Sequence, residues 1–173
     1  TSQEDTAYYD PNKNALVHYE GRRVFMMYAE TSDIPFTEYS VGLYGIEGKE
    51  GTWKDAEDGT LSKNPIEHGH VDSVCAIPLT VHGDERKNVY YWITVGETKS
   101  ESYELHDYIK YKSPDYLIES TTKFWKAWLT RQESLECNIK EERQLDLFKK
   151  SLFYIISQCC CMYSFHFSFP LLL

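Results

Sequence analysis

A short acidic cluster is the part of the sequence whose residue types are best suited to chemistry. Asp55, Glu57 and Asp58 lie close together in a glycine-rich segment. Two carboxyl groups held a fixed distance apart can act as general acid and general base. The run also offers oxygen ligands for calcium, although its spacing differs from that of an EF-hand loop. The interpretation that the sequence favours over both is structural, with the carboxylates accepting hydrogen bonds from backbone amides and holding a loop.

Histidine and tryptophan residues near this cluster offer further chemistry. His68 and His70 alternate along the chain, so both imidazoles would face one side of a strand, and with Asp72 they could bind a metal ion. This reading is not favoured, and no metal site or other cofactor is expected. Trp53 could stack on a sugar ring, but a buried packing role is the preferred interpretation. Trp125 and Trp128 are expected to lie on a helix and to pack into the protein core.

The charge balance and the cysteines exclude several classes of protein. The net charge of −9 leaves no basic surface for a nucleic acid, so we expect no nucleic-acid partner. Three of the five cysteines are consecutive, at positions 159–161, which fits neither a disulfide framework nor a zinc site. The first residues form no apolar signal segment, and the cysteine pattern fits a reducing compartment, so we expect a cytoplasmic location.

The elements that would position these residues change in character near Gly96. Before it, apolar runs separated by turn residues predict antiparallel strands. These strands cover Ala15–Tyr19, Val24–Ala29, Tyr39–Tyr44, Val71–Val81 and Val89–Val95. The long segment between the third and fourth strands contains the acidic cluster, and Trp53, Pro65 and Ile66 suggest that it is packed. Strands followed by helices indicate two architectural units rather than alternating βαβ units.

Helical spacing follows over Glu97–Lys112, with Tyr103, Leu105, Tyr108 and Ile109 on the predicted apolar stripe. Ser113-Pro114-Asp115 is a strong start signal for a second helix, which should run to about Arg131. A third helix is predicted over Glu141–Ser157, with Leu145, Phe148, Leu152 and Ile155 on one stripe.

The C-terminal stretch Leu152–Leu173 contains no Asp, Glu, Lys or Arg and has the length of a membrane span. Serine, glutamine and histidine dilute it, and Pro170 lies near its end, so a membrane partner is not favoured. The preferred interpretation of residues 159–173 is a non-native end, such as the product of a frameshift or a read-through.

The segment Gly51–Val74, GTWKDAEDGTLSKNPIEHGHVDSV, carries a family resemblance. It resembles the N-terminal domain of prokaryotic glucoamylases and related trehalases, glycoside hydrolase family 15. The flanks are similar too: Asp5–Phe25 resembles a hairpin in the middle of that domain, Val89–Thr98 its final strand, Pro114–Trp128 its connecting helix, and Leu147–Gln158 the first helix of the catalytic barrel. The resemblance covers about residues 5–158 and is collinear.

The resemblance implies a mainly β fold with C-terminal helices: a partial antiparallel β-supersandwich, then linker helices and the start of an (α/α)6 barrel. The implied division is a sandwich domain over 1–96, a helical linker over 97–131, the barrel start over 132–158 and a non-family tail over 159–173. Trp53, Asp55, Glu57, Asp58, Asn64 and Asp72 become structural residues and candidates for a domain interface.

The resemblance also implies a function. The intact parent would be an inverting glycosidase that hydrolyses α-glucosidic bonds of an α-glucan, an oligosaccharide or trehalose. Its general-acid and general-base glutamates lie on barrel loops beyond Gln158, so no residue of this chain inherits a catalytic role. Sandwich strands that the family carries before Asp5 are also missing. The chain is therefore expected to be inactive alone. The alternative is a non-catalytic carbohydrate-binding or interaction module.

Overall fold

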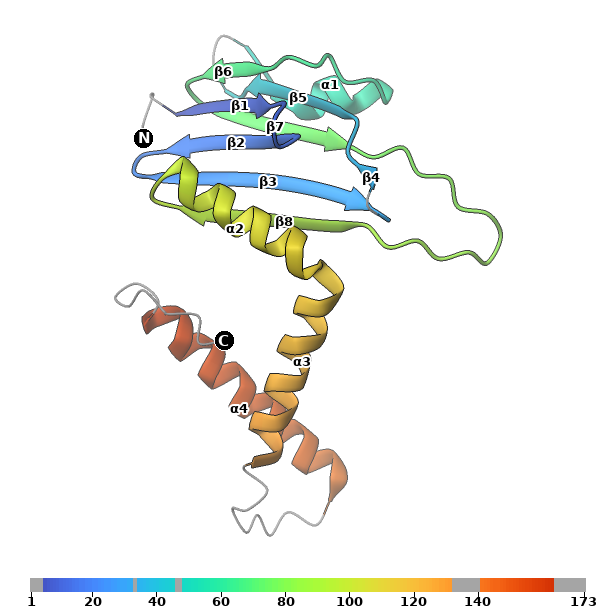
Figure 1. Ribbon diagram of the computed structural model, residues 1–173, viewed down its shortest axis with the longest axis vertical. Coiled ribbons are helices and arrows are strands. Elements are labelled where there is room, and N and C mark those ends of the chain that lie inside the picture. Colours follow the sequence, from blue (N-terminus) through green and yellow to red (C-terminus); the bar gives the residue numbers. More distant parts are fainter. Residues whose placement is uncertain (1–4, 33, 46–47, 132–140, 164–173) are drawn as a thin grey trace. The chain divides into compact units, whose positions relative to one another are not determined.

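The computed structural model describes residues 5–32, 34–45, 48–131 and 141–163 (Figure 1). The chain divides into two compact units, residues 1–114 and 115–173. Antiparallel sheets and one long helix form the first unit, and two helices form the second. The order of antiparallel strands followed by helices that the sequence predicts is therefore confirmed, whereas helices and strands contribute about equally, so the fold is mixed rather than mainly β.

The larger sheet of the first unit is built around a hairpin of neighbouring strands. β1 (Thr6–Asp10) pairs with β2 (Ala15–Glu20), and β2 pairs with β3 (Arg23–Thr31), all antiparallel. β8 (Tyr90–Gly96) pairs with the other edge of β3, and β6 (Ile66–His68) pairs with β1. The short β4 (Ile34–Pro35) pairs with the end of β3. Strands far apart in sequence thus share one sheet.

A second, two-stranded sheet covers part of one face of the larger sheet. It consists of β5 (Glu38–Leu43) and β7 (Val71–Ala76). The ring of Tyr39 stacks on Tyr9 with centroids 3.7 Å apart, and His18 Nε2 lies 2.8 Å from the hydroxyl of Ser73. The apolar core lies between and beside these strands and includes Ala7, Leu16, Val17, Met26, Phe36 and Val41.

Helix α2 (Lys99–Lys112) packs on the opposite face of the larger sheet. Its buried side chains are Ser102 and His106, which contact the sheet through hydrogen bonds: Ser102 donates to the Val24 carbonyl, and Trp92 Nε1 donates to His106 Nδ1. The helix predicted over Glu97–Lys112 is confirmed, and Tyr103 of its predicted apolar stripe packs against the core. The two fully buried side chains are polar, and hydrophobic periodicity does not detect them.

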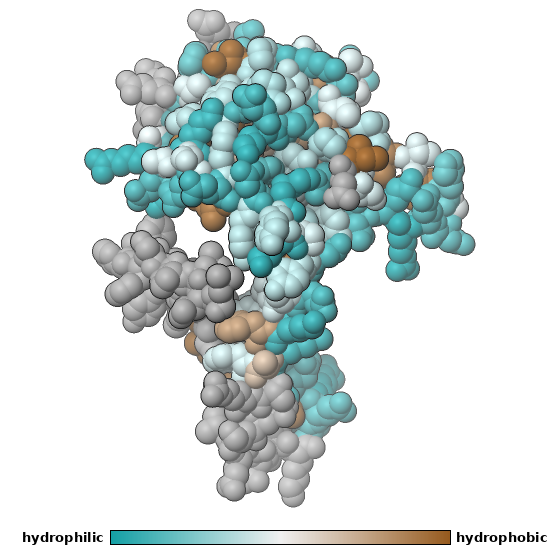
Figure 2. Space-filling view, in the orientation of Figure 1, coloured by the Kyte–Doolittle hydropathy of each residue, from teal (hydrophilic) through white to brown (hydrophobic). Residues whose placement is uncertain are grey.

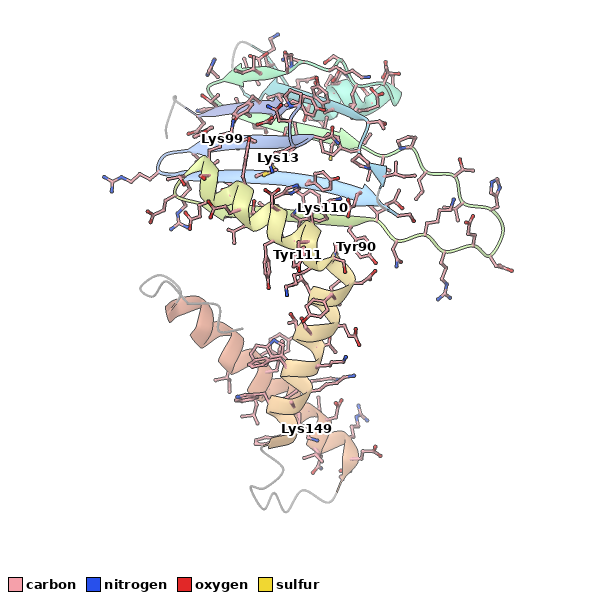
Figure 3. All side chains as sticks on the ribbon, viewed as in Figure 1. Lys13, Tyr90, Lys99, Lys110, Tyr111 and Lys149 are labelled. Atoms are coloured by element: carbon pink, nitrogen blue, oxygen red, sulfur yellow. The ribbon has the colours of Figure 1, made fainter. Side chains whose placement is uncertain are left out.

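Ion pairs tie the two ends of α2 to the same sheet face. Lys99 lies 3.2 Å from the carboxylate of Asp10, and Lys110 pairs with Glu30; both acidic side chains are only 4% exposed. Tyr103 also donates a hydrogen bond to Asp10. Lys13, in the β1–β2 turn, pairs with Asp107 at 2.6 Å. Figure 3 shows Lys13, Lys99 and Lys110 between the strands and this helix.

The predicted strand Val71–Val81 ends earlier than expected, at Ala76. Residues 77–89 instead form an extended, largely exposed excursion that leaves the sandwich and returns to β8. Lys87 Nζ donates to the Thr80 carbonyl across this excursion, and Thr31 Oγ1 donates to the Asn88 carbonyl at its base. On the face shown in Figure 2, the first unit is mostly hydrophilic with small scattered apolar patches.

The described part of the second unit consists of α3 (Pro114–Arg131) and α4 (Glu142–Tyr163). Trp125 contacts Phe153 edge to face with ring centroids 5.0 Å apart, so the two helices pack on each other through aromatic side chains. On the stripe predicted for α4, Phe148 and Ile155 are 43% and 60% exposed. Residues 132–140, at the start of the predicted barrel segment, and residues 164–173 of the predicted tail lie outside the described residues.

Candidate functional site

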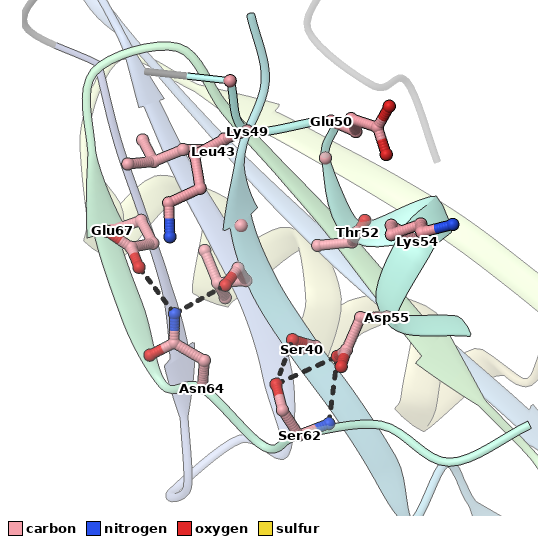
Figure 4. A pocket seen from close by; sticks show the side chains of 14 residues that line it. Ser40, Leu43, Lys49, Glu50, Thr52, Lys54, Asp55, Ser62, Asn64 and Glu67 are labelled. Carbon is pink, nitrogen blue, oxygen red and sulfur yellow. Dashed lines mark hydrogen bonds between the residues drawn. The ribbon is translucent and has the colours of Figure 1, made fainter. Parts of the chain in front are cut away.

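The segment that carries the motif folds into a compact hydrogen-bonded structure beside a shallow pocket of about 330 Å³ (Figure 4). The segment begins with α1 (Thr52–Asp55), continues into a 3-10 turn, η1 (Ala56–Asp58), and then returns along β5 to β6. The side chains that line the pocket are mostly polar and include Ser40, Lys49, Glu50, Thr52, Lys54, Asp55, Ser62, Asn64 and Glu67.

Asp72 on β7 fixes the start of this segment. Its Oδ2 accepts hydrogen bonds from the Thr52 amide at 2.7 Å and from the Thr52 hydroxyl at 3.1 Å. A Cβ atom at Gly51 would lie 2.6 Å from the same oxygen, and Gly51 has a φ of 93°. A Cβ atom at Gly42 would lie 2.8 Å from Thr52 Cγ2. Glycine is therefore required at both positions for the carboxylate and the helix start to meet.

Asp55 closes the segment on itself. Its Oδ2 accepts hydrogen bonds from the amide and the hydroxyl of Ser62, both at 2.9 Å, and Ser62 in turn lies 2.9 Å from the hydroxyl of Ser40 on β5. The hydrogen bond from the Ser62 amide, together with those from the Ser40 and Ser62 hydroxyls, lowers the pKa of Asp55. A carboxyl group whose ionised form is stabilised in this way is a poor general acid at neutral pH.

Asn64 attaches the returning chain to the free edge of β5. Its Nδ2 donates to the Val41 carbonyl and to Glu67 Oε1, both at 2.8 Å. The backbone continues the ladder, because the Val41 amide donates to the Asn64 carbonyl and the Lys63 amide donates to the Tyr39 carbonyl. Lys63 adopts a φ of 58°, which turns the chain at this point. The segment thus acts as an additional strand along β5.

Glu57, Asp58 and Trp53 lie on the exposed side of the segment. Asp58 accepts a hydrogen bond of 2.8 Å from the Thr60 amide, and Glu57 forms an exposed ion pair with Lys54 at 2.7 Å. Trp53 is 55% exposed, with the ammonium of Lys54 above its ring, so the predicted buried packing role of Trp53 is wrong. The residue occupies the second position of a one-turn helix whose inward-facing position is Thr52. Ile66, which suggested packing of the segment, is 46% exposed as well.

Each carboxylate of the motif therefore has a partner within its own segment or on the neighbouring strand. Asp55, Asp58 and Asp72 accept hydrogen bonds from backbone amides, which is the structural role that the sequence favours. His68 Nδ1 lies 2.8 Å from the Thr6 hydroxyl and so contacts a neighbouring strand. Within the part of the chain that the structure describes, no group of three or more His, Cys, Asp or Glu side chains is placed to hold a metal ion.

The sequence analysis did not single out several residues of the pocket, among them Ser40, Lys49 and Glu67. Ser40 alternates along β5 with the inward-facing Tyr39 and Val41, so it lies on the outer face of the strand, yet it is 2% exposed because the motif segment covers it. A serine at an outward position of a strand gives no local signal of this polar contact. The backbone path of the segment brings Lys49 and Glu67 to the pocket, and no local sequence pattern specifies that path.

Comparison with known proteins found no matching protein family, no matching curated protein and no matching solved structure. Among the helices of the described residues, none combines the length and the apolar character that a membrane crossing requires.

Proposed function

We propose that this chain is a non-catalytic portion of a glucoamylase-type glycoside hydrolase, in which a β-sandwich with α2 supports a catalytic barrel. The parent enzyme hydrolyses α-glucosidic bonds of α-glucans, oligosaccharides or trehalose. In this proposal, the helices α3 and α4 are the connection to the barrel and its first helix. The catalytic general acid and general base belong to the barrel and are absent from this chain.

The observation that carries the proposal is the role of the residues that resemble the family motif. Gly51 allows Asp72 to reach the Thr52 amide, Asp55 holds Ser62, and Asn64 holds Val41. These contacts indicate that the motif residues are needed to fold one loop. A pattern of this kind supports a shared structural domain and does not require shared chemistry at the same residues.

The helices of the second unit support the same proposal. In the barrel architecture, helices pack in pairs and each pair buries apolar side chains against its neighbours. The Trp125–Phe153 contact packs the proposed connecting helix α3 on α4, the proposed first helix of the barrel. Ile118 and Phe124 on α3 are 60% and 61% exposed, and Leu147 on α4 is 56% exposed, which leaves apolar surface for further helices.

A hydrolysis assay tests the non-catalytic role. Purified chain is incubated with maltooligosaccharides and with trehalose, and released glucose is measured. We expect no release above a buffer control, because the motif carboxylates are held in structural contacts. The matched variants are Asp55→Asn and Glu57→Gln. Glucose release that co-purifies with the chain and disappears in either variant would place a catalytic carboxylate in this loop and contradict the proposal.

Trp53 favours a second candidate function, a carbohydrate-binding module. An exposed tryptophan next to a polar pocket is suited to stack on one face of a sugar while hydroxyl and amide groups bind its edge. Trp53 is 55% exposed, and its neighbours Thr52 and Lys54 line the pocket.

A titration separates the two candidates. Maltoheptaose is added to the isotopically labelled protein, and the indole N–H signals are followed by NMR. The binding module predicts saturable shifts of the Trp53 signal that vanish in the Trp53→Ala variant. The purely structural role predicts no shift of that signal. The Trp128→Ala variant is the control, because that half-buried tryptophan lies in the second unit.

A further inference from the structure

Helix α2 is attached to the larger sheet mainly through polar and ionisable side chains. Its two fully buried residues, Ser102 and His106, are polar, and Tyr103 packs against the core. The ion pairs of Lys99 and Lys110 lie before and after these residues along the helix. The strands β1, β2, β3 and β8 pair with one another and not with the helix. Movement of α2 away from the sheet therefore breaks no hydrogen bond of the strand ladder.

The imidazole of His106 occupies an enclosed position in the middle of α2. The rings of Tyr28 and Trp92 lie beside it, with centroids 4.9 and 5.7 Å away, and the residue is 4% exposed. Trp92 Nε1 donates a hydrogen bond of 3.2 Å to His106 Nδ1. Because Nδ1 accepts this bond, the neutral imidazole carries its hydrogen on Nε2.

The two carboxylates that act on His106 are already paired with lysines. Asp107, on the same helix, pairs with Lys13 of the β1–β2 turn, and Glu30 of β3 pairs with Lys110. From the sheet, Tyr28 adds a phenol and Trp92 an indole, neither of which carries a charge at neutral pH. Burial lowers the pKa of His106, and the two lysines lower it further against Asp107 and Glu30.

A proton on Nδ1 conflicts with this arrangement in two ways. The new N–H group would face the N–H group of Trp92, so that two donors meet. The imidazolium would also be a buried cation whose neighbouring carboxylates are engaged elsewhere. Ser102 is attached to the sheet one turn before His106 and Lys110 one turn after it. The imidazole therefore reaches water when the helix moves away from the sheet.

Apolar side chains beneath α2 oppose this movement at neutral pH. Thr94 Oγ1 donates to the Ser102 carbonyl, and Met26 is the register partner of Thr94, so Met26 and the alternate residues Val24 and Tyr28 face the helix. All three are at most 5% exposed. Their exposure to water costs free energy, and proton uptake by His106 offsets part of that cost.

We infer that α2 is an acid-sensitive latch: when His106 takes up a proton, the helix opens from β3 and β8 while the strands of the larger sheet stay paired. Openings of this kind are local and need not unfold the rest of a domain. In the released helix His106 regains the ordinary histidine pKa of about 6.5. The closed state is therefore most favoured above that pH and loses stability as the pH falls below it. This inference does not depend on the proposed function.

Amide hydrogen exchange of the full chain, followed by NMR at about pH 7 and about pH 5.5 with and without low concentrations of urea, tests the inference. After correction for the intrinsic rate at each pH, we expect the amides of residues 103–109 to exchange up to about tenfold faster in acid, with little effect of urea. The amides of Val17 and Met26 should remain more protected and respond strongly to urea, because they exchange through global unfolding. Equal protection and equal urea dependence of helix and sheet amides would overturn the inference.

Two histidines form a matched pair for the source of the proton effect. His106→Gln keeps an acceptor for the Trp92 indole and takes up no proton, so exchange of the α2 amides should no longer depend on pH. His18→Gln removes the histidine that contacts Ser73 of the second sheet, and it should keep the native pH dependence in α2. A pH dependence that persists in His106→Gln, or that is lost in His18→Gln, contradicts the latch.

The indole N–H signal of Trp92 provides a second measurement on the native protein, which requires no variant. This group is bonded to His106 in the closed state. Its exchange with water should become faster in acid together with that of the α2 amides. An indole N–H that stays protected while the helix amides exchange faster would show that α2 frays without leaving the sheet, and the inference would be wrong.

Discussion

Asp72 and Thr52, which are 20 residues apart, are joined by a hydrogen bond of 2.7 Å from the Thr52 amide to Asp72 Oδ2. Thr52 is buried, and the other oxygen of Asp72, Oδ1, is buried without a hydrogen-bond partner among the described residues. The carboxylate therefore connects β7 to the start of α1 through a single oxygen. The stability of the whole motif loop should depend on this contact.

Replacement of Asp72 by alanine tests that dependence. The variant leaves the Thr52 amide and hydroxyl without their acceptor, and hydrogen bonds to charged groups contribute about 1.5–3 kcal/mol. We expect the free energy of unfolding of the first unit to fall by about 2 kcal/mol in urea titrations followed by near-UV circular dichroism. Asp84→Ala, in the exposed excursion between β7 and β8, should leave the transition in place. Equal behaviour of the two variants would show that the contact is not important for stability.

Gly51→Ala and Gly48→Ala form a matched pair for the close approach of the backbone to Asp72. Both glycines have positive φ values, 93° and 76°, so both variants carry backbone strain. Only at Gly51 does the added Cβ meet an obstacle, Asp72 Oδ2 at 2.6 Å; at Gly48 nothing lies within 4 Å. The Gly51 variant should be less stable than the Gly48 variant by about 1–3 kcal/mol in the same unfolding assay. A difference near zero would mean that the loop relaxes without cost.

His106 makes stability depend on pH. Burial lowers the pKa of His106, and Lys13 and Lys110 lower it further against the opposing charges of Asp107 and Glu30. Because the unfolded chain binds the proton more readily, stability is full above the unfolded pKa of about 6.5 and declines as the pH falls below it. We expect the urea midpoint to drop between about pH 7 and pH 5.

The variant His106→Gln identifies the source of this slope, because glutamine can accept the hydrogen bond from Trp92 without taking up a proton. Its midpoint should change less with pH than that of the native protein. His18, whose pKa burial also lowers, leaves a residual slope. The control is His82→Gln in the exposed excursion, which should keep the native slope. If the urea midpoint of His106→Gln depends on pH as steeply as that of the native protein, His106 is not the source of the pH dependence.

The Lys110–Glu30 ion pair should contribute more than the exposed pairs on the helices. Glu30 is only 4% exposed at its side chain, so loss of Lys110 leaves a buried carboxylate without its partner. Lys110→Met should destabilise the first unit by about 2 kcal/mol, below the range for fully buried pairs because Lys110 itself is 37% exposed. Lys123→Met removes the exposed pair with Glu119 and should have no measurable effect. Thermal unfolding of both variants provides the comparison.

The sequence predicted the strands of the larger sheet where apolar runs are bounded by turn residues, as in Val24–Ala29 and Val89–Val95. It failed where contacts are polar or distant. Periodicity assigned α2 an apolar stripe, yet Ser102 and His106 are its buried residues, because the helix is positioned by Val24 and Trp92, which lie outside its own segment.

The motif loop shows the same limit. The acidic residues suggested hydrogen bonds to backbone amides from composition alone, and Asp55 and Asp58 make them. The direction in which Trp53 points depends on which side of a one-turn helix meets β7, and that side is decided by Asp72, which is far away in the sequence. Local patterns do not contain this information, so the burial of Trp53 was predicted wrongly.

The coding DNA beyond the codon for Gln158 tests the central proposal most directly. If the chain is part of a glucoamylase-type hydrolase, one of the three reading frames should continue with paired amphipathic helices and two glutamates on the loops between them, suited to act as general acid and general base. Sequencing of this region in the gene and in its transcript gives the answer. Three frames without such a continuation would contradict the proposal and leave the carbohydrate-binding module as the remaining candidate.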